Sequence, residues 1–162
     1  NTGLNSEFMR DFIADLAQAE GLEARHVLSK SKCLSADVTA AYDPTYASAY
    51  EKTNSTFLNN GIAMSKYTGS RGKSGTSEAT AEFVAEVRSI FEKNDVLWQI
   101  GELGKVDGGG GGTVAMFVAN LNVDVLDVGV PVLSMHSPFE IVSKTDIYMT
   151  YKGIKAFFES KI

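Results

Sequence analysis

Helical and strand patterns alternate along this chain of 162 residues, and this alternation constrains the fold more than any other feature. Phe8, Phe12, Ile13 and Leu16 recur at helical spacing and predict an amphipathic helix over residues 5–20. A second apolar face of this kind predicts a helix over residues 77–93. Short apolar runs elsewhere predict strands, and strands that alternate with helices are typical of a layered α/β domain.

The remaining predicted elements complete this order. Strands are expected at 33–38, 61–67, 96–100 and 123–130, and shorter or later helices at 23–28, 113–120 and 146–158. Residues 41–60 are expected to form a long surface excursion, and residues 68–75 a loop. The glycines at 108–112 give the backbone its greatest freedom. Neither an internal repeat nor a linker divides the sequence, so one domain is expected.

The composition excludes several classes of protein. With 44% hydrophobic and 22% charged residues, the chain is expected to be globular. Its net charge of -5 and the lack of a basic cluster argue against nucleic acid and anionic membranes as partners, and favour small molecules or peptides. No stretch approaches the ~20 apolar residues of a membrane span. Cys33 is the one cysteine, which predicts a buried structural thiol in a cytoplasmic protein.

His136 follows an apolar run that begins at Val130, and Pro138 then prevents the strand from continuing. This pattern places an imidazole at the end of a predicted buried strand, where metal ligands and catalytic groups commonly lie. A structural histidine held by hydrogen bonds is the alternative. Glu140 could hold the imidazole or a nearby main-chain N–H group, or it could be an ordinary acid at a helix entry.

Asp37 ends another apolar run, which begins at Cys33. A buried carboxylate requires a cation or several hydrogen-bond donors, so Asp37 is either a metal ligand or a strand-end cap. Asp37 and His136 could together give an oxygen and a nitrogen to zinc, but a stable zinc site uses three or four protein ligands.

Other segments offer weaker candidates. The glycine run could bring backbone close to a ligand and direct a helix capped near Thr113 toward an anion, or it could be a flexible loop. It lacks the Lys-Ser/Thr pair of a P-loop. A Ser/His/Asp triad with Ser134 or Ser137 as nucleophile lacks the G-x-S-x-G elbow. Arg71 and Lys73 could contact a substrate carboxylate or be solvated.

Four ordered segments resemble a known family: LSADV at 34–38, YTGSRGKSG at 67–75, GELGKVD with the following glycines at 101–112, and MHSPFE at 135–140. In this order they resemble the carboxy-terminal portion of the catalytic domain of bacterial M18-family metalloaminopeptidases, the aminopeptidase I type. The resemblance covers essentially all of residues 1–162. It implies a zinc-dependent exopeptidase fold, a mixed sheet sandwiched between helices, which is incomplete in this chain.

The resemblance also implies the roles of individual residues. Asp37 would be a ligand of one metal ion and His136 of the other, with Glu140 in support. Substrate contacts would come from Lys66, Arg71, Gly111, Gly112 and Thr113. The family's earlier His, its bridging Asp and the Glu-Glu pair that supplies the general base are expected upstream of Asn1, together with an inserted dimerisation domain. No catalytic residue is therefore expected within this chain.

The resemblance implies removal of amino-terminal residues from peptides by water activated at two zinc ions, with cobalt or manganese as other possible metals. Ala40 stands where the aspartyl-selective branch carries His, which favours neutral or apolar amino-terminal residues. Acidic residues are the alternative, because Lys66 and Arg71 could contact a substrate carboxylate. The complete enzyme is expected to form dimers that assemble into a dodecamer-like complex, and this chain alone is expected to be inactive. A non-catalytic peptide-binding or oligomerisation module is the alternative, because a partial domain exposes a sheet edge and apolar helix faces.

Overall fold

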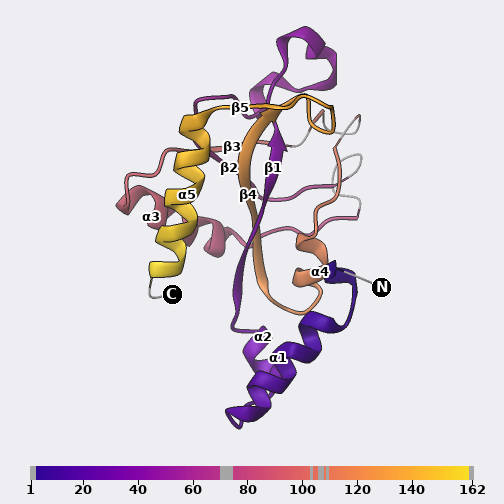
Figure 1. The fold of residues 1–162 in the computed structure, drawn as a ribbon, viewed down its shortest axis with the longest axis vertical. Coiled ribbons are helices and arrows are strands. Elements are labelled where there is room, and N and C mark those ends of the chain that lie inside the picture. The colour runs from indigo at the N-terminus through magenta and orange to yellow at the C-terminus, as the bar shows by residue number, and fades with distance from the viewer. Residues whose placement is uncertain (1–2, 70–74, 103, 106–107, 109, 161–162) are drawn as a thin grey trace.

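The computed structural model of the protein describes residues 3–69, 75–102, 104–105, 108 and 110–160, and within these residues a five-stranded mixed sheet forms the centre (Figure 1). The strands are β1 (Lys32–Ala40), β2 (Ile62–Ser65), β3 (Trp98–Ile100), β4 (Asp124–Leu133) and β5 (Ile141–Val142). Their order is β1-β4-β2-β3, and β5 pairs with β4. β4 is parallel to β1 and antiparallel to β2 and β5, while β2 and β3 are parallel. The predicted mixed sheet is confirmed.

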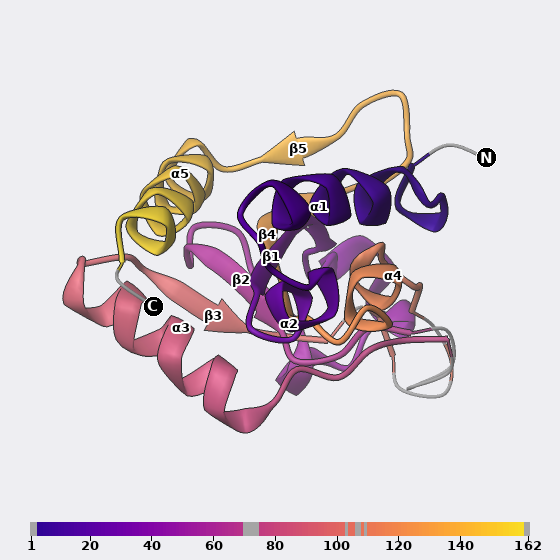
Figure 2. The same ribbon diagram turned by 90° about the horizontal axis from the view of Figure 1, so that it is seen from below.

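Helices cover both faces of this sheet (Figure 2). One face carries α1 (Phe8–Ala19), α2 (Ala24–Leu28) and α4 (Ala115–Ala119), and the other carries α3 (Ala81–Lys93) and α5 (Lys144–Glu159). Neighbouring side chains of β4 point to opposite faces and explain this division. Val125 packs in a cluster with Leu28 and Val118, whereas Leu126 packs in a cluster with Phe83 and Phe157.

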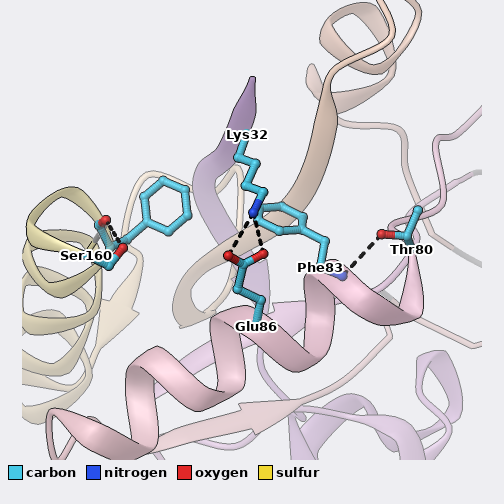
Figure 3. Close-up of polar contacts among 6 residues, drawn as sticks. Lys32, Thr80, Phe83, Glu86 and Ser160 are labelled. Atoms are coloured by element: carbon cyan, nitrogen blue, oxygen red, sulfur yellow. Dashed lines mark hydrogen bonds and ion pairs between the residues drawn. The ribbon is translucent and has the colours of Figure 1, made fainter. Parts of the chain in front are cut away.

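Two polar contacts hold the first half of α3 in place (Figure 3). The helix begins after Thr80, whose hydroxyl accepts a hydrogen bond from Phe83 N–H at 3.2 Å and so satisfies one of the free N–H groups of the first turn. One turn later, the ammonium of Lys32 on β1 lies 2.7 and 2.6 Å from the two carboxylate oxygens of Glu86. This partly buried ion pair connects the helix to the edge strand.

A buried carboxylate positions α5. Asp146 lies in the first turn of the helix with 0% of its surface exposed. Its two carboxylate oxygens accept hydrogen bonds from Asn59 N–H and Gly61 N–H, each at 2.8 Å. These bonds connect α5 to the turn that precedes β2, and the second satisfies the main-chain N–H of Gly61, which would otherwise be buried without a partner.

The predicted helices and the four predicted strands are confirmed, with changes at their ends. β1 continues to Ala40 and β4 to Leu133, both beyond the predicted ends. β5 was not predicted, because two residues are too few to produce a sequence pattern. The predicted excursion at 41–60 contains two short 3-10 helices, Pro44–Ala49 and Lys52–Asn54, and a third, Gly3–Asn5, precedes α1.

Part of the apolar side of α1 is exposed. Met9 and Ile13 pack against the cluster around Val125, but Phe8 and Phe12 are 78% and 55% exposed, and their rings stack on each other. The helical spacing therefore predicted the helix correctly, but it did not predict which apolar side chains are covered. Exposed apolar stripes of this kind favour contact with another protein surface.

Among the helices of the described residues, none has the length and apolar character needed to cross a membrane.

Replacing Gly129 with Ala is expected to lower the free energy of unfolding by about 3 kcal/mol or more. A Cβ atom at this position of β4 would lie 1.5 Å from the carbonyl oxygen of Asp37, so the β1-β4 ladder would have to separate. Urea unfolding measures the change. Gly108→Ala is the matched control, because its Cβ would meet no atom closer than 3.8 Å. Equal stability of the two variants would contradict the close approach of β4 to β1.

Candidate functional site

Small polar side chains gather on one face of the sheet, where β1, β4 and β2 lie side by side (Figure 1). Ser35 of β1 and Ser65 of β2 are both paired with Asp127 of β4. Two residues further along, Asp37 of β1 is paired with Gly129. Paired residues of neighbouring strands share a face, and these residues line one cavity of about 20 Å³.

Two threonines from loops border the same cavity. Thr68 follows β2 and Thr113 precedes α4, and their hydroxyl oxygens lie 3.3 Å apart. Thr113 Oγ1 also accepts a hydrogen bond from Ala115 N–H at the first residue of α4, although the N-cap residue itself is Val114, whose side chain forms no cap bond. A Cβ on Gly112 would lie 3.3 Å from the carbonyl oxygen of Gly75. The glycines therefore allow two loops to meet beside the cavity.

Asp127 is the most unusual group in this cavity, since its carboxylate is buried on β4 with 9% of the residue exposed. Within the described part of the chain, its Oδ2 accepts one long hydrogen bond, 3.4 Å from Thr68 Oγ1, and its Oδ1 has no partner. Burial raises the pKa of the Asp127 carboxyl above its ordinary range, and the charge of Asp37 adds to the increase. The neighbouring hydroxyls of Ser35, Thr113 and Thr68 lower the pKa of Asp127, but the net shift remains upward.

Asp127 is not among the site residues predicted from the sequence. The signal was present, because an acid interrupts the apolar run from Val125 to Val130. The pattern could not show that Ser35, Ser65 and Thr68 lie around this acid, since they belong to distant parts of the chain.

Cys33 lies near Asp127. The sequence predicted a buried thiol, but Cys33 is only partly buried. Burial, and secondarily the charge of Asp127, raise the pKa of the Cys33 thiol.

Asp37 differs from its predicted environment. The sequence predicted a buried carboxylate at the end of a strand, but β1 continues to Ala40 and Asp37 is exposed. Its Oδ1 accepts a hydrogen bond from Val38 N–H at 2.7 Å. The carboxylate thus lies at the mouth of the cavity with one oxygen used by its own strand, and it does not need a cation to compensate for burial.

His136 also lies outside the strand that was predicted to carry it. β4 ends at Leu133, and His136 is an exposed residue of the turn that leads to β5. Ser134 and His136 both adopt left-handed backbone conformations, with φ of 59° and 67°. Such conformations are uncommon for residues other than glycine and often occur at functional sites. Glu140 Oε1 accepts a hydrogen bond from the main-chain N–H of His136 at 2.6 Å, which is one of the two contacts considered for Glu140.

The structure brings only some of the predicted site residues together. Asp37 and Thr113 line the cavity, whereas His136 and Glu140 are not among its lining residues. The described part of the chain contains no cluster of three or more His, Cys, Asp or Glu side chains that could hold a metal ion. The chain therefore presents two separate zinc-type donors, the Asp37 carboxylate and the His136 imidazole.

The other predicted substrate contacts are not among the residues that line the cavity. Lys66 forms an ion pair with Glu78 in which Nζ and Oε1 lie 2.5 Å apart, so its charge is already partly neutralised. Gly111 is partly exposed and Gly112 exposed, in the segment that leads to Thr113. Arg71 and Lys73 lie outside the described residues.

Almost the whole chain is similar to proteins of one known family. The family model described as aminopeptidase I zinc metalloprotease (M18) matches residues 1–158. The chain belongs to the M18 family. The probable M18 family aminopeptidase 1 of Clostridium acetobutylicum is 49% identical over 160 residues, which are 96% of this chain and 34% of that protein.

Solved M18 structures have the same fold. The crystal structure of the Thermotoga maritima M18 aminopeptidase is 41% identical, with a TM-score of 0.93 over 98% of this chain and 36% of that chain. The S. cerevisiae mApe1 dodecamer is 22% identical, with a TM-score of 0.78 over 97% of this chain and 34% of that chain, and shows likeness of fold alone. The chain thus has the α/β fold of the M18 aminopeptidases and spans about a third of the length of these relatives.

The raised pKa of Asp127 predicts a pH-dependent effect of Asp127→Asn. Ionisation of a buried carboxyl whose folded-state pKa is raised destabilises the folded state, and this penalty grows as pH increases from the unfolded-state value of about 3.9 through the folded-state pKa. Asn does not ionise. The variant is therefore expected to gain stability relative to the unmodified protein as pH rises from 3.5 to 8. Urea unfolding in buffers of low ionic strength measures the difference, with exposed Asp124→Asn on the same strand as control. A difference that shrinks with increasing pH would contradict the prediction.

Proposed function

We propose that this chain forms part of a metalloaminopeptidase that removes amino-terminal residues from peptides. The observation that carries the proposal is the match of the M18 family model to residues 1–158, a range that contains both Asp37 and His136. Because the chain spans about a third of its relatives, the proposal concerns a longer protein in which an amino-terminal portion of the catalytic domain completes the site.

Zinc is proposed to bind through Asp37 and His136. A carboxylate oxygen and an imidazole nitrogen are ordinary zinc donors, and both residues are exposed and therefore accessible. They fit as two ligands but not as a complete site, so the other ligands and the carboxylate base are proposed to come from outside this chain. Two bound ions, zinc or alternatively cobalt or manganese, would lower the pKa of water and polarise the substrate carbonyl.

The other predicted residues of this chain are proposed to position these groups and the peptide. Glu140 holds the main chain of His136 and so limits where the imidazole can point. Gly111, Gly112 and Thr113 lead into the cavity that Asp37 borders, and their backbone is proposed to lie along the substrate. Lys66 is a weaker candidate for a substrate contact, because an incoming carboxylate would compete with Glu78.

The proposed substrates are peptides that begin with a neutral or apolar residue. Ala40, at the end of β1, has no group that could pair with an acidic side chain, and it occupies the position of a His in the aspartyl-selective branch. The proposed setting is the cytoplasm, consistent with a single cysteine and no internal disulfide.

Self-association is proposed for the complete protein. The exposed apolar side chains of α1 support it, as does the dodecameric assembly named for the S. cerevisiae structure of the same fold. The exposed stripe on α1 also favours a second candidate function, a non-catalytic oligomerisation module. The two candidates differ in whether Asp37 and His136 are needed for anything other than folding.

In the longer protein, His136→Ala and Asp37→Asn are expected to lower the rate of Leu-p-nitroanilide hydrolysis by more than about 100-fold, because loss of a direct ligand should exceed the effect of losing a group behind it. Bound zinc, measured by atomic absorption, is expected to fall in parallel. His26→Ala is the matched control, since His26 is an exposed histidine on α2.

The 162-residue chain alone is expected to be inactive toward the same substrate with excess zinc or cobalt. Enzyme-like hydrolysis by the chain alone would contradict the proposal that the base lies elsewhere. Full activity and zinc content in both ligand variants would instead favour a role of this chain as an oligomerisation module.

The substrate preference is tested by comparing the hydrolysis of Leu- and Asp-p-nitroanilide by the longer protein. The Leu substrate is expected to be cleaved faster.

A further inference from the structure

The cavity on the β1-β4-β2 face contains a negative charge that the described residues do not balance. Asp127 is 9% exposed. Among the described residues, its Oδ1 has no hydrogen-bond partner and its Oδ2 accepts a single bond of 3.4 Å, which is long for a hydroxyl donor. None of the described residues that line the cavity is Lys, Arg or His. A buried carboxylate without a cation or adequate donors is strongly unfavourable.

The groups around Asp127 in the cavity are hydroxyls, whose oxygens can coordinate a cation. Ser35, directly opposite Asp127 in the β1-β4 pairing, is 6% exposed, and its Oγ also lacks a partner among the residues that the structure describes. Ser65, opposite Asp127 on the other side, donates its hydroxyl proton to the carbonyl of Gly101 at 2.8 Å, so lone pairs remain for the cavity. An oxygen-rich set of this kind suits a hard cation.

The size and charge of the cavity limit which cation fits. A volume of about 20 Å³ is enough for one water-sized body. Mg²⁺ retains several waters, for which this volume is too small, and Ca²⁺ is commonly bound by several carboxylates, which is more negative charge than the buried part of the cavity holds. One buried carboxylate among neutral hydroxyls balances a single positive charge.

We propose that this cavity binds a monovalent metal cation of the size of sodium or potassium, with Asp127 Oδ1 and Ser35 Oγ as protein ligands. The inference does not depend on the proposed peptidase activity. A cation here balances Asp127 next to Asp37, and it connects β1 and β4 with the loops that carry Thr68 and Thr113. A water molecule or a proton on Asp127 are the other possible occupants, and neither depends on the identity of the salt.

The test is thermal unfolding of the protein at neutral pH and constant ionic strength in sodium, potassium and choline chloride. The melting temperature is expected to be higher by about 2–4 °C in sodium or potassium than in choline, because a ligand that binds the folded state raises it. Asp127→Asn is expected to abolish this difference. The matched control Asp124→Asn, an exposed acid on the same strand, is expected to retain it.

Sodium-23 relaxation in the presence of the protein provides a second, direct measurement. Protein-dependent line broadening is expected, with competition by potassium and loss in Asp127→Asn. Ser35→Ala keeps the carboxylate and is expected to weaken the sodium affinity several-fold. Equal melting temperatures in the three salts without line broadening would overturn the proposal in favour of water or a proton. A salt-specific increase that persists in Asp127→Asn would overturn the assignment to this cavity.

Discussion

The close approach of β4 to β1 at Gly129 is the constraint on which the site depends. Any side chain at this position would occupy the space of the Asp37 carbonyl group. The absence of a side chain lets the two strands keep an unbroken parallel ladder over nine residue pairs, Lys32↔Asp124 to Ala40↔Val132. That register places Ser35 beside Asp127, and so the composition of the cavity follows from one glycine.

The face of the sheet that carries this cavity changes character along its length. At one end, Cys33 and Val125 pack beneath α1, α2 and α4 in an apolar cluster. One residue pair further along on the same face, Ser35 and Asp127 replace them, and loops rather than helices cover them. The opposite face remains apolar, with Leu126 and Val128 under α3 and α5. The polar end is thus a local departure from an otherwise ordinary α/β core, and departures of this kind usually have a functional reason.

The sequence predicted the architecture well and the surroundings of the site poorly. Helical spacing located α1 and α3, and apolar runs located β1 and β4, because these signals are local. Asp127 was missed because its importance depends on Ser35 and Ser65, which strand pairing brings from distant positions. The burial of Asp37 was predicted wrongly because no local pattern reveals that β1 is an edge strand with a carboxylate hydrogen-bonded to its own backbone.

The turn between β4 and β5 has a consequence for how the imidazole is placed. The turn is closed at its base by two pairs, Val132↔Val142 and Leu133↔Ile141, and within it Glu140 binds the main chain of His136. The position of the histidine main chain is therefore set by loop length and backbone geometry. A single-residue insertion or deletion between Leu133 and Ile141 would leave the histidine in the sequence and still remove it from its place. In a comparison of homologous chains, the spacing within this turn is thus as informative about function as the identity of the histidine.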